Sequence, residues 1–191
     1  MEPVVSPVLP APAIVGPRLD LVSLPPDLLD ALLAGDRDAV RRLAPFPVPD
    51  GFPGDGARDL IAYRLRQIRI DAAWLPWSIR AVVRRGEPPR MVGYANFHGP
   101  PGINDLGLEG AVEVGYTVFP DDRCKGYATE AAQAMLDWAR REHGVTEFVS
   151  GVTPDNVPSL RVNEKLGFVP TGDLIDGERI FRLVLPRPYS R

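Results

Sequence analysis

Three short, apolar, β-strand-like segments in close succession constrain the fold of this chain most. They are SIRAVV at 78–83, MVGYANF at 91–97 and AVEVGYTVF at 111–119. Their apolar, β-branched and aromatic residues are typical of strands, and the connections between them are rich in glycine and proline. Strands joined by such turns pair most readily as antiparallel neighbours. The three segments therefore predict an antiparallel meander, around which the rest of the chain must pack.

Helical and strand patterns alternate on both sides of this meander. Further strands are predicted at 18–24, 148–152 and 180–185, and helices at 27–43, 59–70, 129–142 and 156–166. The proline- and glycine-rich stretch 44–56 is predicted to be a long loop. The order of elements predicts a mixed α/β (α+β) fold with a sheet of about six or seven strands.

Length and composition indicate one folded domain. The chain has 191 residues, of which 45% are hydrophobic and 25% charged, as in a globular protein with an ordinary core. Residues 1–17 are rich in proline and are predicted to form a flexible tail, so the domain is expected to span residues 18–191.

Composition also argues against several classes of function. A net charge of -3 disfavours the broad basic face of a nucleic-acid-binding protein. Cys124 is the only cysteine, and the two histidines show no zinc-ligand spacing, so we expect no disulfide and no metal. The N-terminus lacks a basic leader and is broken by prolines, which fits neither a signal peptide nor a membrane helix. A cytoplasmic protein without membrane contact is expected.

The loop RCKGYA at 123–128 precedes the helix at 129–142. Amides at the start of a helix lack partners and lie at the positive end of its dipole, so they can bind phosphate oxygens. Gly126 allows close backbone approach, and Arg123 and Lys125 could add positive charge. These residues alone fit an anion site and a solvated charged turn equally well.

Two acids immediately before this loop oppose an anion site. Asp121 and Asp122 would repel a phosphate unless their side chains point away from it. Their orientation is therefore a specific question for the structure.

The loop and its neighbours resemble the acetyl-CoA-binding core of the GNAT superfamily of N-acetyltransferases. Residues 123–128 match its R/Q-x-x-G-x-G/A loop, VEVGYTV at 112–118 resembles its central strand, and NVPSLRVNEKLGF at 156–168 resembles its second half. The NxxS and EKLGF patterns are most similar to the RimJ/RimL-like branch, whose members acetylate protein N-termini and other amines. The resemblance extends over residues 78–185 and more loosely over residues 18–77.

The resemblance implies a GNAT fold, with a mixed, mostly antiparallel sheet flanked by helices. It also implies direct acetyl transfer from acetyl-CoA to the amine of a small molecule or peptide. The loops at 44–56 and 98–110 are expected to border the acceptor site, although the composition of neither loop indicates which acceptor binds. The chain could act as a homodimer. A non-catalytic acyl-CoA-binding sensor of the same fold is the alternative.

The resemblance also assigns residues to the cofactor. The backbone of Thr117 and Val118 would pair with the pantetheine arm like an added strand. Asn156 would bind pantetheine, cap its helix, or do both. Thr129 would cap its helix or contact a phosphate. The amides assigned to the pyrophosphate are those of Arg123, Cys124, Lys125, Gly126, Tyr127 and Ala128.

Glu113 is the candidate general base. Transfer to an amine requires the unprotonated amine, which a nearby carboxylate can help to generate. Alternation along the strand places Glu113 on one face with Gly115 and Thr117, unless a bulge reverses it. A carboxylate in a partly apolar cleft has a raised pKa that suits this role. A glutamate that faces solvent or pairs with an arginine is the alternative.

The leaving thiolate requires a hydrogen-bond or proton donor. Many members of the superfamily have a tyrosine four residues before the Gly-Phe pair, where this chain has Asn163. An amide is too weak an acid for this role, so Ser159 is the donor that the RimJ/RimL-like pattern suggests. Cys124 lies near positive charges that would lower a thiol pKa, but direct transfer leaves no role for a nucleophile.

Overall fold

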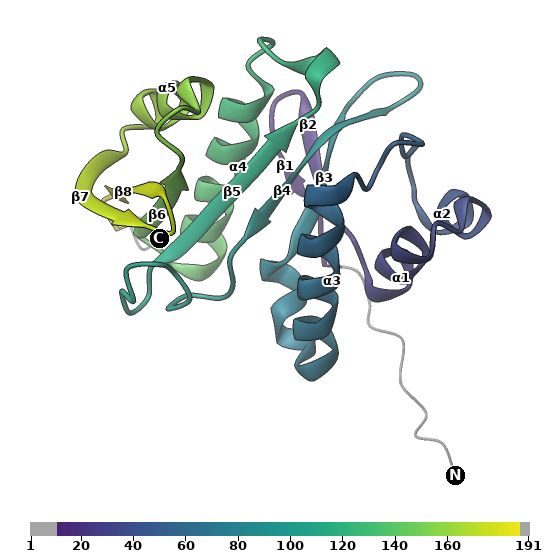
Figure 1. Ribbon diagram of the computed structural model, residues 1–191, viewed down its shortest axis with the longest axis horizontal. Helices are drawn as coiled ribbons and strands as arrows, with labels where there is room; N and C mark the ends of the chain where they lie inside the picture. The colour runs from purple at the N-terminus through teal and green to yellow at the C-terminus, as the bar shows by residue number, and fades with distance from the viewer. Residues whose placement is uncertain (1–10, 188–191) are drawn as a thin grey trace.

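The computed structural model describes residues 11–187, which form a twisted sheet with helices on both faces (Figure 1). The helices are α1 (Pro26–Ala34), α2 (Arg37–Leu43), α3 (Asp55–Ile70), α4 (Tyr127–His143) and α5 (Val157–Leu166), with short 3-10 turns at Ala72–Trp77 and Pro120–Asp122. The strands are β1 (Ile14–Val15), β2 (Leu19–Ser23), β3 (Ile79–Arg84), β4 (Arg90–Phe97), β5 (Val112–Val118), β6 (Glu147–Val152), β7 (Val169–Ile175) and β8 (Glu178–Val184).

The sheet has eight strands in the order β1-β2-β3-β4-β5-β6-β8-β7. All neighbours pair antiparallel except β5 and β6, which are parallel. The predicted mixed, mostly antiparallel fold flanked by helices is confirmed, and so is the meander formed by β3, β4 and β5. The predicted count of six or seven strands was too low.

Two of the eight strands have no counterpart among the predicted ranges, β7 and β1, and β1 lies in the segment that was predicted to be a flexible tail. Ile14 and Val15 pair with Leu21 and Asp20, and the Ile14 side chain is only 2% exposed. An edge strand tolerates nearby prolines because one of its sides needs no hydrogen bonds. The fold therefore begins before Arg18, and the prediction of a tail up to residue 17 was wrong for this strand. Residues 1–10 of the predicted tail lie outside the described residues.

Each face of the sheet has its own core. Helix α4 covers one face, where Val112 and Val114 of β5 are buried against it, as strand alternation predicts. Helices α1 and α3 cover the other face, with a separate apolar cluster that includes Leu28 and Ile61. No helix among residues 11–187 is long and apolar enough to cross a membrane.

The two halves of the sheet meet at β5 and β6, where the site is built. These parallel strands are paired only at Val112 with Phe148 and at Glu113 with Val149. Beyond that point β5 continues to Val118, paired with β4 on one side alone. The side of β5 that faces β6 is therefore an open strand edge over residues 114–118.

Candidate functional site

A cleft of about 540 Å³ lies beside the open edge of β5. Its walls come from β5, from the loop before α4, from the first turn of α4 and from α5. Every residue that was predicted to bind the cofactor or the leaving thiolate lines this cleft, except Lys125. These residues are Thr117, Val118, Arg123, Cys124, Gly126, Tyr127, Ala128, Thr129, Asn156 and Ser159.

The loop between β5 and α4 has the geometry of an anion site. Cys124 and Gly126 have positive φ angles of 60° and 81°, and backbone turns of this kind point successive amides into one concavity. Gly126 is the N-cap of α4, and no side chain caps this end of the helix. The first amides of a helix with 17 residues are therefore directed towards the cleft.

Of the two acids before the loop, Asp122 pairs with cations, and Asp121 lines a different cleft on the face that carries α3. Asp122 is buried, with Oδ1 3.0 Å from Nζ of Lys125 and Oδ2 3.0 Å from a guanidinium nitrogen of Arg90. Lys125 also donates a hydrogen bond of 2.7 Å to the carbonyl of Asp121. This pairing holds Lys125 against the loop, which explains why it does not line the cleft. Arg123, which does, donates from Nε to the Val118 carbonyl at 3.2 Å.

The opposite wall is the start of α5. Asn156 caps this helix by accepting a hydrogen bond of 3.2 Å from the amide of Ser159. Asn163 is buried and accepts a bond of 3.3 Å from the Ser150 hydroxyl of β6, so it points away from the cleft. Tyr116, to which no motif in the sequence assigns a role, also lines this cleft. Burial raises the pKa of its hydroxyl, and an interaction with the Ser159 side chain opposes this rise.

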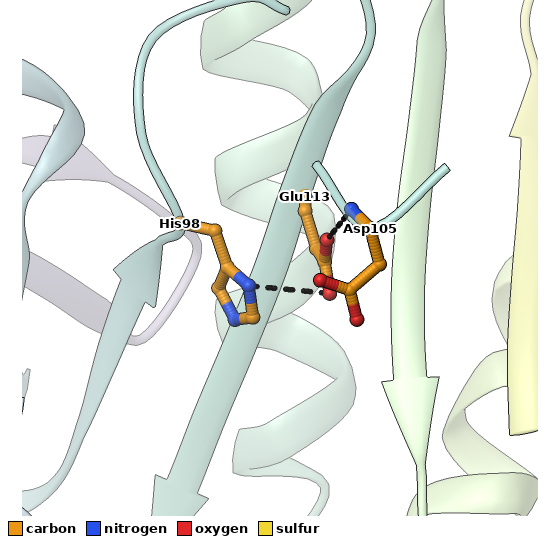
Figure 2. A group of neighbouring side chains, drawn as sticks. All are labelled: His98, Asp105 and Glu113. Atoms are coloured by element: carbon orange, nitrogen blue, oxygen red, sulfur yellow. Dashed lines mark hydrogen bonds and ion pairs between the residues drawn. The ribbon is translucent and has the colours of Figure 1, made fainter. Parts of the chain in front are cut away.

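Glu113 lies near the start of β5, on the face opposite α4, and its side chain is 0% exposed. The amide of Asp105 donates to Oε2 at 2.8 Å, and Nδ1 of His98 lies 3.2 Å from Oε1 (Figure 2). Pairing between β4 and β5 is regular, so no bulge reverses this face. Burial raises the Glu113 pKa to about 7. The alternative of a solvent-facing glutamate is wrong.

A buried arginine organises the surroundings of this carboxylate. Arg64 of α3 donates to Oδ1 of Asn96 at 3.0 Å and to the His98 carbonyl at 2.7 Å. Burial, aided by the Arg64 charge, lowers the His98 pKa to about 4, so the ring is neutral at pH 7. From the sequence, His98 is expected to have a structural or acceptor-side role before a Gly-Pro-Pro turn, and nothing in the sequence marks Asp105. The register of β4 against β5, with the His98 amide bonded to the Glu113 carbonyl, is the signal that could have paired His98 with Glu113.

His98, Asp105 and Glu113 are also the one group among residues 11–187 whose donor atoms come together as in a metal site. One atom from each side chain lies within 4.8 Å of the others. Imidazole and carboxylate are donors that a divalent cation accepts. The expectation of no metal was based on spacing along the chain, which does not detect residues that a sheet brings together.

A second cleft, of about 450 Å³, lies on the face that carries α3. Residues of the predicted 44–56 loop form one wall, including Pro49 and Phe52, and Tyr94 and Phe119 form the other. Thr117 lines both clefts, so they meet at β5. The open edge of β5 therefore lies where the first cleft meets the second.

An uncapped helix N-terminus beside an open strand edge is an arrangement that suits an extended anionic ligand. Residues 18–169 match the family described as acetyltransferase (GNAT) domain, so the chain belongs to the GNAT acetyltransferases. The uncharacterised N-acetyltransferase YjdG of Bacillus subtilis is 28% identical over 152 residues, which are 80% of this chain and 85% of YjdG.

Solved structures share the fold. A GNAT-family acetyltransferase from Bacillus anthracis superimposes with a TM-score of 0.60 at 24% identity, over 91% of this chain and 98% of that one. The microcin C7 self-immunity acetyltransferase MccE, solved in complex with acetyl-CoA and AMP, gives a TM-score of 0.57 at 14% identity. That match covers 88% of this chain and 93% of MccE.

Proposed function

We propose that this protein transfers the acetyl group of acetyl-CoA directly to an amine. One observation carries the proposal: the cleft beside the open edge of β5 ends at the uncapped N-terminus of α4. A diphosphate suits the helix end and an amide-bearing arm suits the strand edge. Membership of the GNAT acetyltransferases supports the same chemistry.

Different residues of this cleft bind different parts of acetyl-CoA. Backbone amides of residues 123–128 hold the pyrophosphate, with Arg123 adding charge at the mouth of the cleft. The backbone of Thr117 and Val118 pairs with the pantetheine arm along the open edge. Ser159, in the first turn of α5, donates a hydrogen bond to the leaving thiolate, and Asn156 holds the start of that helix in place.

Glu113 receives the proton that the amine must lose. An ammonium group has no free electron pair, so acetyl transfer requires removal of a proton. A carboxylic acid with a pKa of about 7 is half ionised at neutral pH, and it is a stronger base than an ordinary glutamate. Desolvation is the largest cause of this shift.

The acceptor occupies the second cleft, whose lining suits a cationic amine with an apolar neighbour. Phe52 and Phe119 provide apolar surface, and Asp55 and Asp121 provide negative charge at the same cleft. An α-amino group, with an ordinary pKa near 8, loses its proton more easily than a lysine. A protein N-terminus, as in the RimJ/RimL-like branch, or a small-molecule amine therefore fits this cleft best.

The test measures CoA release with a thiol reagent across a panel of N-terminal peptides and small amines. We expect release with at least one acceptor, and Glu113→Gln lowers the turnover while acetyl-CoA still raises the melting temperature. Acetyl-CoA binding without release from any acceptor would instead support the sensor.

A further inference from the structure

Glu113 is too deeply buried to meet an acceptor amine directly. Its side chain is 0% exposed, and it lines neither of the two clefts. Oε1 makes no hydrogen bond of ordinary geometry among residues 11–187, and the polar contact that the structure gives it is Nδ1 of His98 at 3.2 Å. A buried base of this kind requires another group to bring it the proton.

His98 is placed to be that group. Its Nδ1 lies 3.2 Å from Oε1 of Glu113, and Figure 2 shows the ring directed at the carboxylate. The side chain is 37% exposed, so the ring reaches from the buried carboxylate to the surface. The second ring nitrogen, Nε2, lies 3.5 Å from the position that a Cβ would occupy at Gly115. Nε2 therefore lies over β5 at Gly115, two residues before the Thr117 that lines both clefts, although His98 itself lines neither cleft.

We propose that His98 relays the proton from the acceptor amine to Glu113. Nε2 accepts a proton as the N–H bond of the amine breaks, and Nδ1 gives its own proton to Oε1. The ring passes from the Nδ1–H to the Nε2–H tautomer and stays neutral. One N–H bond forms as another breaks at the ring, and an O–H bond forms on Glu113, so no further reactant is needed. This step rests on the proposed acetyl transfer.

The charges around the pair favour a neutral ring and a protonated carboxylate. Arg64 of α3 disfavours the imidazolium form of His98. The negative charges of Asp105, in the β4–β5 loop, and Glu178, in β8, disfavour the carboxylate form of Glu113. The charge of Arg64 and the hydrogen bond from the Asp105 amide favour it. Burial of both residues favours their neutral forms more strongly than any of these charges. The proton therefore comes to rest on Glu113.

The first experiment needs no acceptor. Because the chain has only two histidines, the ring nitrogens of ¹⁵N-histidine-labelled protein can be assigned with a single variant, His143→Gln. Above pH 7 we expect the His98 ring as the Nδ1–H tautomer, bonded to ionised Glu113. Below pH 7 the protonated carboxyl donates to Nδ1, and the ring switches to Nε2–H. In Glu113→Gln this switch should be absent.

The second experiment uses turnover with an acceptor identified by CoA release. We expect His98→Ala to lower kcat by roughly 100-fold, the lower limit for loss of a positioned proton acceptor, while acetyl-CoA binding is kept. Added imidazole should restore part of the rate in His98→Ala and none in Glu113→Gln. His143→Gln is the matched control and should retain the wild-type rate.

Distinct results separate the relay from the acetyl transfer on which it rests. A wild-type protein that never releases CoA contradicts the acetyl transfer, while the ¹⁵N experiment still decides whether His98 and Glu113 share a proton. A single tautomer between pH 5.5 and 8.5, or an unchanged kcat in His98→Ala, overturns the relay. So does a loss of activity on chelation that zinc restores, because the trio would then hold a metal.

Discussion

Replacing Glu113 by glutamine should stabilise this protein at neutral and alkaline pH. The raised pKa means that the folded state binds a proton more tightly than the unfolded chain does. The stability that Glu113 contributes to the wild-type protein is therefore fully present below the ordinary pKa of 4.5 and is lost as the pH rises through about 7. Glutamine mimics the protonated acid at every pH and does not suffer this loss.

The size of the effect follows from the shift. A change from 4.5 to about 7, at about 1.36 kcal/mol for each pH unit, corresponds to roughly 3 kcal/mol. Full burial of the side chain means that solvent screening reduces this value little. Glutamine can still accept the hydrogen bond from the Asp105 amide, so the substitution keeps that contact.

Urea denaturation followed by circular dichroism between pH 4.5 and 8.5 measures the difference in free energy of unfolding between variant and wild type. We expect it to grow by roughly 3 kcal/mol up to pH 7 and then to stay constant, with a gain of roughly 6–12 °C in Tm. Glu109→Gln, an exposed glutamate in the same loop region, is the control and should show a flat difference. A flat or falling difference for Glu113→Gln would refute the buried, proton-binding role of this residue.

Three other substitutions test the cleft and the core. Gly126→Asp should weaken acetyl-CoA binding at least about tenfold by calorimetry, because it places a negative charge at the uncapped helix start and a side chain at a φ of 81°; unchanged affinity would contradict the pyrophosphate site. Ser159→Ala should lower kcat roughly tenfold without changing KM for acetyl-CoA, and a change in KM alone would show a binding role instead. Arg80→Met should cost about 3 kcal/mol in urea denaturation, since it leaves three carbonyls, that of Leu21 fully buried, without the donor that Arg80 provides. A loss below about 1 kcal/mol would contradict this.

Local pattern in the sequence was sufficient to predict most strands of the sheet. The period of two in 111–119 placed Val112 and Val114 on one face and Glu113 on the other, as the structure has them. Period and propensity failed at Ile14–Val15, because two residues beside prolines carry no pattern of their own and are held by pairing with β2. The positions of cleft residues followed from the motif, since a loop that opens a helix is a local structure.

Contacts between distant segments were decided by the tertiary structure alone. Strand alternation predicts the face on which Glu113 lies, but the 98–110 loop determines how fully it is buried, and burial is the main cause of its raised pKa. Likewise, the charge pattern could not show that Asp122 pairs with Arg90 and Lys125. The sequence by itself determined which elements form and which motif opens α4. The protonation chemistry of the site depends on desolvation and on distances across the sheet, which no local pattern encodes.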